Sequence, residues 1–192
     1  HPEVRLRAAL ALGSEGRDVL LAMAGDHATS DEHREAAIRG LSPDVPEDLL
    51  LRVLRRFAGS MFKDRPEQPG AARACVQALG QHRTPEAFSA LQALLLANAA
   101  LGGDAARALG QLGGEEAEAL LMGALDCDVF ESRLAAAEVL GEVGSTAAVP
   151  ALREAEGHGV EIRRVARQAI ADIQARATEA PGAVSLAGAE AG

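Results

Sequence analysis

The chain has 192 residues, of which 48% are hydrophobic, and these are mostly Ala, Leu and Val, with four Phe and no Trp or Tyr. This composition favours closely packed helices over sheets. The formal net charge of -9 disfavours binding to DNA or RNA, which are polyanions. No segment approaches the roughly 20 apolar residues of a membrane span, and the two cysteines, Cys75 and Cys127, are too few for a disulfide framework. These features indicate a cytoplasmic protein.

One phrase recurs along the chain. VRLRAALALG (4–13) is followed by a weaker copy, EHREAAIRGL (32–41), and then by AARACVQALG (71–80), LGGDAARALG (101–110), SRLAAAEVLG (132–141) and IRRVARQAIA (162–171). The last four copies end at intervals of 30, 31 and 30 residues. A period near this length is typical of one supersecondary unit per repeat.

Each copy carries apolar or small residues at fixed offsets, as Val4, Ala8, Ala9 and Leu12 do. This spacing predicts a helix with one apolar face. Second helices are predicted between the copies, at 17–25, 46–57, 85–97, 115–125 and 146–155. Pro150 either kinks the last of these or falls just past a short first turn. Alternating helices repeated five to six times predict an all-α fold, an α-solenoid built from antiparallel helix pairs.

Local signals mark the helix ends. Two pairs have the spacing of a capping box, namely Thr29 with Glu32 and Asp128 with Glu131. We expect four glycines to end helices by adopting positive φ: Gly110, Gly113, Gly141 and Gly144.

The repeats predict an array over residues 1–176, with one irregularity and one tail. The spacing from Leu41 to Gly80 is 39 rather than 30 residues, which predicts an insertion loop at 58–70. Residues 177–192 are rich in Ala, Gly and Glu without periodicity, which predicts a flexible tail. The chain also opens directly on the recurring helix, without a helix to pair with it, so we expect it to be part of a longer protein.

The phrase VRxxAAxxLGxxG, carried by Val4–Gly13 and Ser132–Gly144, and the AVPAL segment at 148–152 resemble the HEAT-repeat superfamily. The similarity is to the short bacterial repeats found in phycobilisome lyases, and it covers about residues 1–175. It implies a solenoid fold. Members of this family include scaffolds, adaptors and chromophore lyases, so the resemblance implies no single activity.

The resemblance also implies a partner-binding concave face, formed by exposed positions of the recurring helices. Carried over residue by residue, these positions are Arg73, Gln77, Gln81, Asp104, Arg107, Gln111, Leu134, Glu138, Glu142, Arg164 and Gln168. Equivalent residues should follow one another about 10 Å apart. The alternative is a solvated face with a weak ion pair between Arg107 and Glu138.

Three other features have both a functional and a structural interpretation. Met61, Phe62 and Lys63 either present an anchor to a partner or belong to a loop that covers adjacent helices. The recurring Arg5, Arg133 and Arg163 either bind an anion or, as we expect, bond to loop carbonyls and carboxylates of a neighbouring repeat. The ligand types between Asp26 and His33 are better explained as caps and solvated charges than as a metal site.

No catalytic constellation, metal site or cofactor is predicted. We expect a non-catalytic scaffold or adaptor that binds a protein partner along the concave face. The first alternative is an accessory enzyme resembling the bilin lyases. The second, nucleic-acid binding, is disfavoured by the net charge and by the lack of Trp and Tyr for base stacking.

Overall fold

The computed structural model describes residues 1–60, 69–97 and 100–179. These residues form eleven α-helices and no strand. The helices are α1 (Pro2–Leu12), α2 (Arg17–Gly25), α3 (Asp31–Leu41), α4 (Glu47–Ser60), α5 (Gly70–Leu79), α6 (Pro85–Ala97), α7 (Gly102–Leu112), α8 (Gly114–Ala124), α9 (Phe130–Val143), α10 (Val149–Ala155) and α11 (Val160–Glu179). Each lies where the sequence predicts a helix, so the all-α prediction is confirmed.

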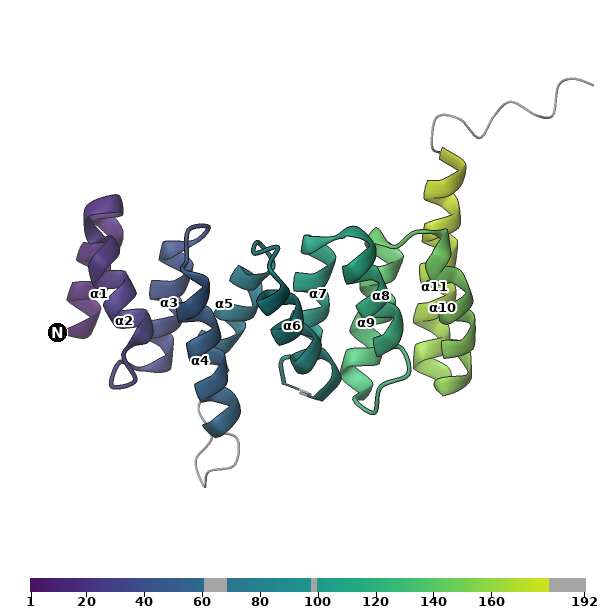
Figure 1. The fold of residues 1–192 in the computed structure, drawn as a ribbon, viewed down its shortest axis with the longest axis horizontal. Coiled ribbons are helices and arrows are strands. Elements are labelled where there is room, and N and C mark those ends of the chain that lie inside the picture. The colour runs from purple at the N-terminus through teal and green to yellow at the C-terminus, as the bar shows by residue number, and fades with distance from the viewer. Residues whose placement is uncertain (61–68, 98–99, 180–192) are drawn as a thin grey trace, which may run out of the picture.

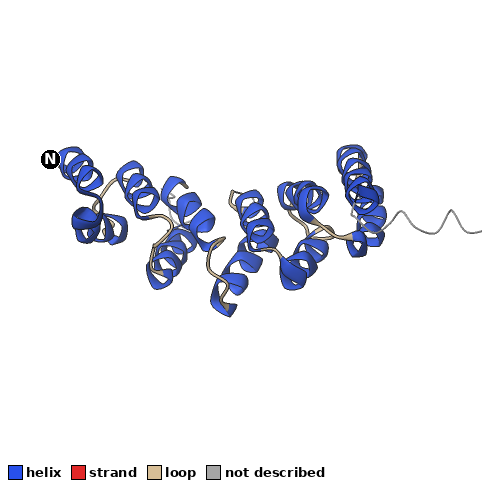
Figure 2. Cartoon of the chain, turned by 90° about the horizontal axis from the view of Figure 1, so that it is seen from above, coloured by secondary structure: helices blue, strands red, loops and turns tan. Residues whose placement is uncertain are grey.

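The helices follow one another in two rows from α1 to α11 (Figure 1). Successive odd-numbered helices pack on each other and form what we call the inner row, while the even-numbered helices form the outer row. Each odd-numbered helix from α3 onward also packs firmly on the even-numbered helix before it. Figure 2 shows that the array is bowed, with the row that starts at α1 on the inner side of the bow. The predicted α-solenoid is confirmed.

One continuous hydrophobic core runs between the two rows. The central small residue of the phrase is fully buried in the five inner-row helices after α1, as Ala37, Cys75, Ala105, Ala136 and Ala166. These short side chains let neighbouring helices approach closely. Larger leucines one turn later, among them Leu79, Leu109 and Leu140, are also fully buried, and each contributes roughly 2 kcal/mol of hydrophobic stabilisation.

The glycines of the phrase have a different role from the predicted one. Gly110 and Gly141 lie within α7 and α9, so the prediction that they end helices is wrong. A Cβ at Gly110 would lie 2.5 Å from Cγ1 of Val139, and one at Gly141 would lie 3.0 Å from Cβ of Ala169. These glycines therefore permit close contact between inner-row helices. Gly113 does end α7 with φ 60, as predicted.

Three helix ends also differ from the prediction. Gly144 follows α9 with φ -68 and ψ 156, which is extended backbone and not the predicted positive φ. The cap of α3 is Ser30, whose hydroxyl accepts a hydrogen bond from the His33 amide at 3.4 Å, because the helix begins one residue later than a Thr29 cap requires. The capping box of Asp128 is wrong for the same reason, since α9 follows Val129.

The predicted boundaries need small corrections. Of the predicted loop at 58–70, residues 58–60 belong to α4, and 61–68 lie outside the described residues. Helix α11 continues to Glu179, beyond the predicted end of the array at 176, while 180–192 are not described. Pro150 lies in the first turn of α10, after a 3₁₀ turn at Thr146–Ala148, where a missing amide donor costs little.

Candidate protein-binding surface

The predicted partner-binding residues lie on the inner row, on α5, α7, α9 and α11 and in the turn after α5. Nine of them are exposed: Arg73, Gln77, Gln81, Arg107, Gln111, Glu138, Glu142, Arg164 and Gln168. Exposure along successive helices makes this surface available for contacts. Leu134 is half-buried and packs against the core, so its predicted exposure is only partial.

Asp104 is a clear exception, because it is only 8% exposed. Its carboxylate lies between two arginines, with Nε of Arg73 at 3.4 Å and a terminal guanidinium nitrogen of Arg107 at 2.9 Å. A buried carboxylate is tolerated where cations and hydrogen bonds replace its water. Asp104 therefore fixes two arginines of neighbouring helices and is not the exposed contact that we predicted.

A groove of about 270 Å³ crosses the inner row at α3, α5 and α7. It brings together five of the predicted residues, Gln77, Gln81, Asp104, Arg107 and Gln111. The floor is formed by small apolar side chains, including Ala74, Ala78 and Ala108. Polar side chains around an apolar floor can bind the backbone and small side chains of another polypeptide.

Besides the floor alanines, sequence reasoning missed the groove residues of α3 and the turn after it, which are Ile38, Arg39 and Ser42. A signal for Arg39 was present, because it has the same offset as Gln77 and Arg107 when the weaker copy is aligned one residue later, at 33–42. The weakness of that copy obscured it. The remaining predicted residues, on α9 and α11, do not line this groove.

Local ion pairs hold the charged side chains near the groove. Arg39 pairs with Glu35 of its own helix at 2.8 Å, and among the described residues Arg107 pairs with Asp104 and not with Glu138. Farther along, the side-chain amide of Gln168 donates to Asp172 at 2.9 Å. The glutamines of the groove thus stand between paired charges, so the surface is polar but nearly neutral.

The recurring arginine has the expected structural role at Arg163 but not at Arg133. Nε of Arg163 donates to the carbonyl oxygen of Glu156 at 3.2 Å, just after α10. The guanidinium of Arg133 instead lies over the ring of Phe130 of its own helix, 5.9 Å from its centre, within the range of a cation–π contact, and its buried Nε has no hydrogen-bond partner among the described residues. Arg5, on α1, is exposed.

The described residues contain no group of three or more His, Cys, Asp or Glu placed to hold a metal ion. Within the predicted cluster, Asp26 accepts the Ala28 amide at 2.9 Å, which lowers its pKa, and Asp31 accepts the amides of Gly70 and Ala71. Burial raises the pKa of the Cys75 thiol to about 12, so this thiol is protonated at neutral pH.

The predicted loop contacts, Met61, Phe62 and Lys63, lie outside the described residues. In the described ranges, no helix is both long enough and apolar enough to cross a membrane.

Two family models match the chain, and their positions agree with this geometry. The model for HEAT repeats matches residues 97–171, from the end of α6 into α11. The model for the PBS lyase HEAT-like repeat matches residues 71–97, which are α5 and α6. The chain is a HEAT-repeat protein. No curated protein matches it, so the family assignment, and with it the predicted resemblance, rests on these two matches and on the solenoid. HEAT repeats typically mediate protein interaction.

Proposed function

We propose that this HEAT-repeat protein is a non-catalytic scaffold or adaptor that binds a partner protein along its inner row. The observation that supports this most directly is the groove at α3, α5 and α7, where residues from three successive repeats line one hollow. Because each repeat supplies a side chain at the equivalent position, a partner lying across the helices would contact successive repeats.

The chemistry of the groove indicates the kind of contact it makes. Gln77, Gln81 and Gln111 each carry one acceptor and two donors on a side-chain amide, which suits the backbone of a bound polypeptide. Arg39 and Arg107 add positive charge at the edge, but each is already paired with a carboxylate. We therefore expect hydrogen bonding and shape, and not net charge, to determine binding.

The other interpretations have less support. The match to the PBS lyase HEAT-like repeat covers a repeat and carries no catalytic group, so an accessory enzyme resembling the bilin lyases is not favoured. The acidic net charge argues against nucleic acid. Cys75 and Cys127 are both free thiols, and the proposal retains a reducing compartment, the cytoplasm.

The test uses a variant that changes the groove without disturbing the core. Gln77→Ala, Gln81→Ala and Gln111→Ala together remove three exposed amides, and we expect them to leave the melting temperature unchanged within about 2 °C. The matched control changes three exposed residues of the outer row, Gln92→Ala, Glu116→Ala and Glu154→Ala. Immobilised wild type, groove variant and control variant are compared for proteins captured from native lysate by quantitative mass spectrometry.

The proposal predicts that at least one protein is retained by the wild type and the control and is depleted about tenfold or more by the groove variant. Equal capture by all three chains would show that the inner row does not bind the partner. Substitution of Arg73 or Arg107 by Glu is unsuitable for this purpose, because it would place a second carboxylate beside buried Asp104 and destabilise the fold.

A further inference from the structure

The edge of the array at which α7 and α9 end contains an open hollow. It has a volume of about 190 Å³ and lies between α7, α8 and α9. Buried side chains of Leu109, Leu121 and Leu140 make its floor apolar. Gly113 and Gly114 at its rim have no side chains to close it. A cavity of roughly 150 Å³ holds a benzene molecule, so this hollow has room for an aliphatic side chain.

The hollow has a fixed wall and one open side. The amide and the hydroxyl of Ser145 donate to the Glu118 carboxylate at 2.7 and 2.8 Å, which joins the turn after α9 to α8. On the other side, a Cβ added to Gly114 would meet no atom within 4 Å. The opening therefore lies at the start of α8.

The next repeat shows how the equivalent place is covered. Gly110 and Gly113, at the end of α7, correspond to Gly141 and Gly144, at the end of α9. The carbonyl oxygens of Gly141 and Gly144 accept hydrogen bonds from the guanidinium of Arg176, at 3.0 Å for Gly144. Helix α11 supplies this arginine because it has 20 residues. Helix α9 has 14 residues and ends before the equivalent position, so it does not cover the end of α7.

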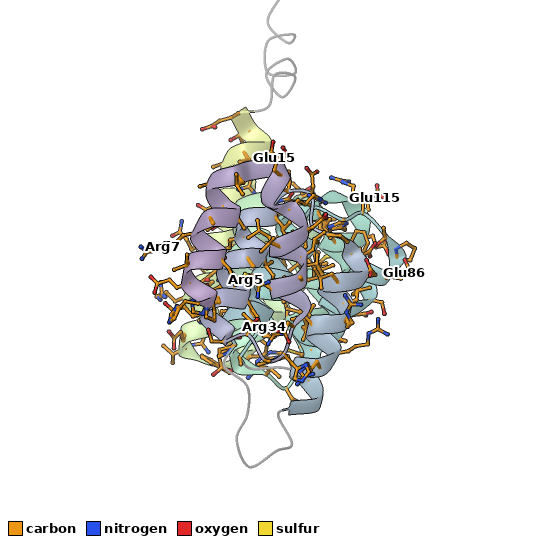
Figure 3. The ribbon with its side chains drawn as sticks, turned by 90° about the vertical axis from the view of Figure 1, so that its left-hand side faces the viewer. Arg5, Arg7, Glu15, Arg34, Glu86 and Glu115 are labelled. Atoms are coloured by element: carbon orange, nitrogen blue, oxygen red, sulfur yellow. The ribbon has the colours of Figure 1, made fainter. Side chains whose placement is uncertain are left out.

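The contact of Arg176 also places the end of α11 beside the hollow, because Gly144 lines the hollow. Figure 3 looks along the array and shows Glu115, which is at the rim, in the upper part of the molecule, where the last turns of α11 project above the other helices. Glu179 ends α11 about one turn after Arg176. The chain then continues as APGAVSLAGAEAG (180–192).

Residues 180–192 match the hollow in size, charge and reach. Val184 and Leu186 are their only branched aliphatic residues, and the others are mostly Ala and Gly. Residues 180–189 carry no charge, which suits a rim that includes the carboxylate of Glu115. Leu186 follows the end of α11 by seven residues, which span at most about 25 Å. This length suits an opening that lies next to the last turns of α11.

We infer that the 184–186 segment of this chain docks in the hollow. Val184 and Leu186 are two residues apart, so they lie on the same side of an extended backbone, and both contact the leucine floor. Composition predicts a flexible tail over 177–192, and the inference makes the opposite prediction for 184–186. It does not involve the groove at α3, α5 and α7, so it does not depend on the proposed function.

The tether favours this segment over one from another molecule. A segment joined to its site by a short flexible linker has an effective concentration in the millimolar range. An unlinked segment of equal affinity would have to reach that concentration to compete. The attachment of α11 beside the hollow therefore indicates an intramolecular occupant.

Hydrogen exchange of the 1–192 chain, measured by NMR, tests both sides of the contact. The first amides of a helix have no partner within the helix, and α8 has no side-chain cap, so the amides of Glu115 and Glu116 report whether the opening is covered. Ordering the segment costs conformational entropy that offsets much of its apolar burial. We therefore expect the amides of 184–186 to exchange about threefold or more slowly than those of an unstructured peptide.

Two double variants of the full chain make the test specific. Val184→Ser with Leu186→Ser removes the apolar contacts, and Ala187→Ser with Ala189→Ser is the matched control. After correction for the intrinsic rate of each sequence, the first variant should exchange about threefold or more faster at 184–186 and at the start of α8, and the control should match the wild type. All three chains should melt within about 2 °C of one another, because none of the substitutions changes the core.

Three results would overturn the inference. The amides of 184–186 in the wild type could exchange at the rate of an unstructured peptide. The amides of Glu115 and Glu116 could exchange equally in the wild type and in the Val184→Ser, Leu186→Ser variant, which would show that the segment does not cover the opening. Protection could also rise with protein concentration, and the occupant would then be the segment of a second copy.

Discussion

Truncation of Leu140 tests the register of the array most directly. Leu140 is fully buried on α9, and it lines a cavity of about 190 Å³ together with Leu109 of α7 and Leu121 of α8. Leu140→Ala removes buried methyl groups and enlarges the existing cavity. We expect the surrounding side chains not to move far enough to fill the enlarged space. We expect a loss of about 3 kcal/mol in the free energy of unfolding, or a fall of roughly 6–12 °C in Tm.

The assay is urea unfolding followed by circular dichroism, with hydrogen exchange of α9 amides as a local readout, because repeat arrays do not always unfold in a single step. Val143→Ala is the matched control on the same helix. Val143 is 55% exposed, so its truncation should change stability by less than about 0.5 kcal/mol. If the two variants lost the same stability, the assignment of the buried face of α9 would be wrong.

Three further predictions address a thiol, a cap and a close contact. Burial raises the pKa of the Cys75 thiol to about 12 from 9.0, so the stability contributed by the protonated thiol is complete below pH 9 and is lost as the pH rises toward 12. In urea unfolding across this range, Cys75→Ala should therefore lose less stability than the wild type, and parallel losses in the two proteins would refute this. Asp31→Ala removes the carboxylate that accepts hydrogen bonds from the Gly70 and Ala71 amides at the start of α5, at 2.9 and 3.2 Å. It should lower the free energy of unfolding by about 1 kcal/mol in the same assay, whereas an unchanged urea midpoint would show that water replaces the carboxylate. Gly141→Leu overpacks the contact with Ala169, so it should reduce the free energy of unfolding by at least about 2 kcal/mol and lower Tm. An unchanged Tm would mean that α9 and α11 separate easily.

The helices and their period could be predicted from the sequence because both depend on residue spacing along one chain. A helix places offsets of four, five and eight on one face, and the same offsets in the phrase recur as buried residues, such as Ala105 and Leu109. The role of Gly141 could not be predicted in this way. Its neighbour Ala169 lies in the next repeat, and the distance between two helices is set by the packing of the whole array.

The groove was predictable in part for the same reason. Gln77 and Arg107 follow from the repeat offset, and Arg39 would have followed from it as well had the weaker copy been aligned at that position. The burial of Asp104 was not predictable, because it depends on arginines from two helices closing over one carboxylate. Sequence offsets identify the side of a helix that a residue occupies, but they do not show how far a neighbouring helix covers it.

The charge of the exposed side chains changes along the inner row. The groove region carries glutamines between paired charges, α9 then presents Glu138 and Glu142, and α11 presents Arg164. Under the proposed function, a partner extended along the row would meet a nearly neutral, an acidic and then a basic region in that order. Because like charges placed opposite one another cost free energy, a shifted or reversed partner would be penalised even where its shape fits. The buried offsets that the repeats share thus determine the fold, while the exposed residues that differ between repeats would determine the direction and register of the proposed binding.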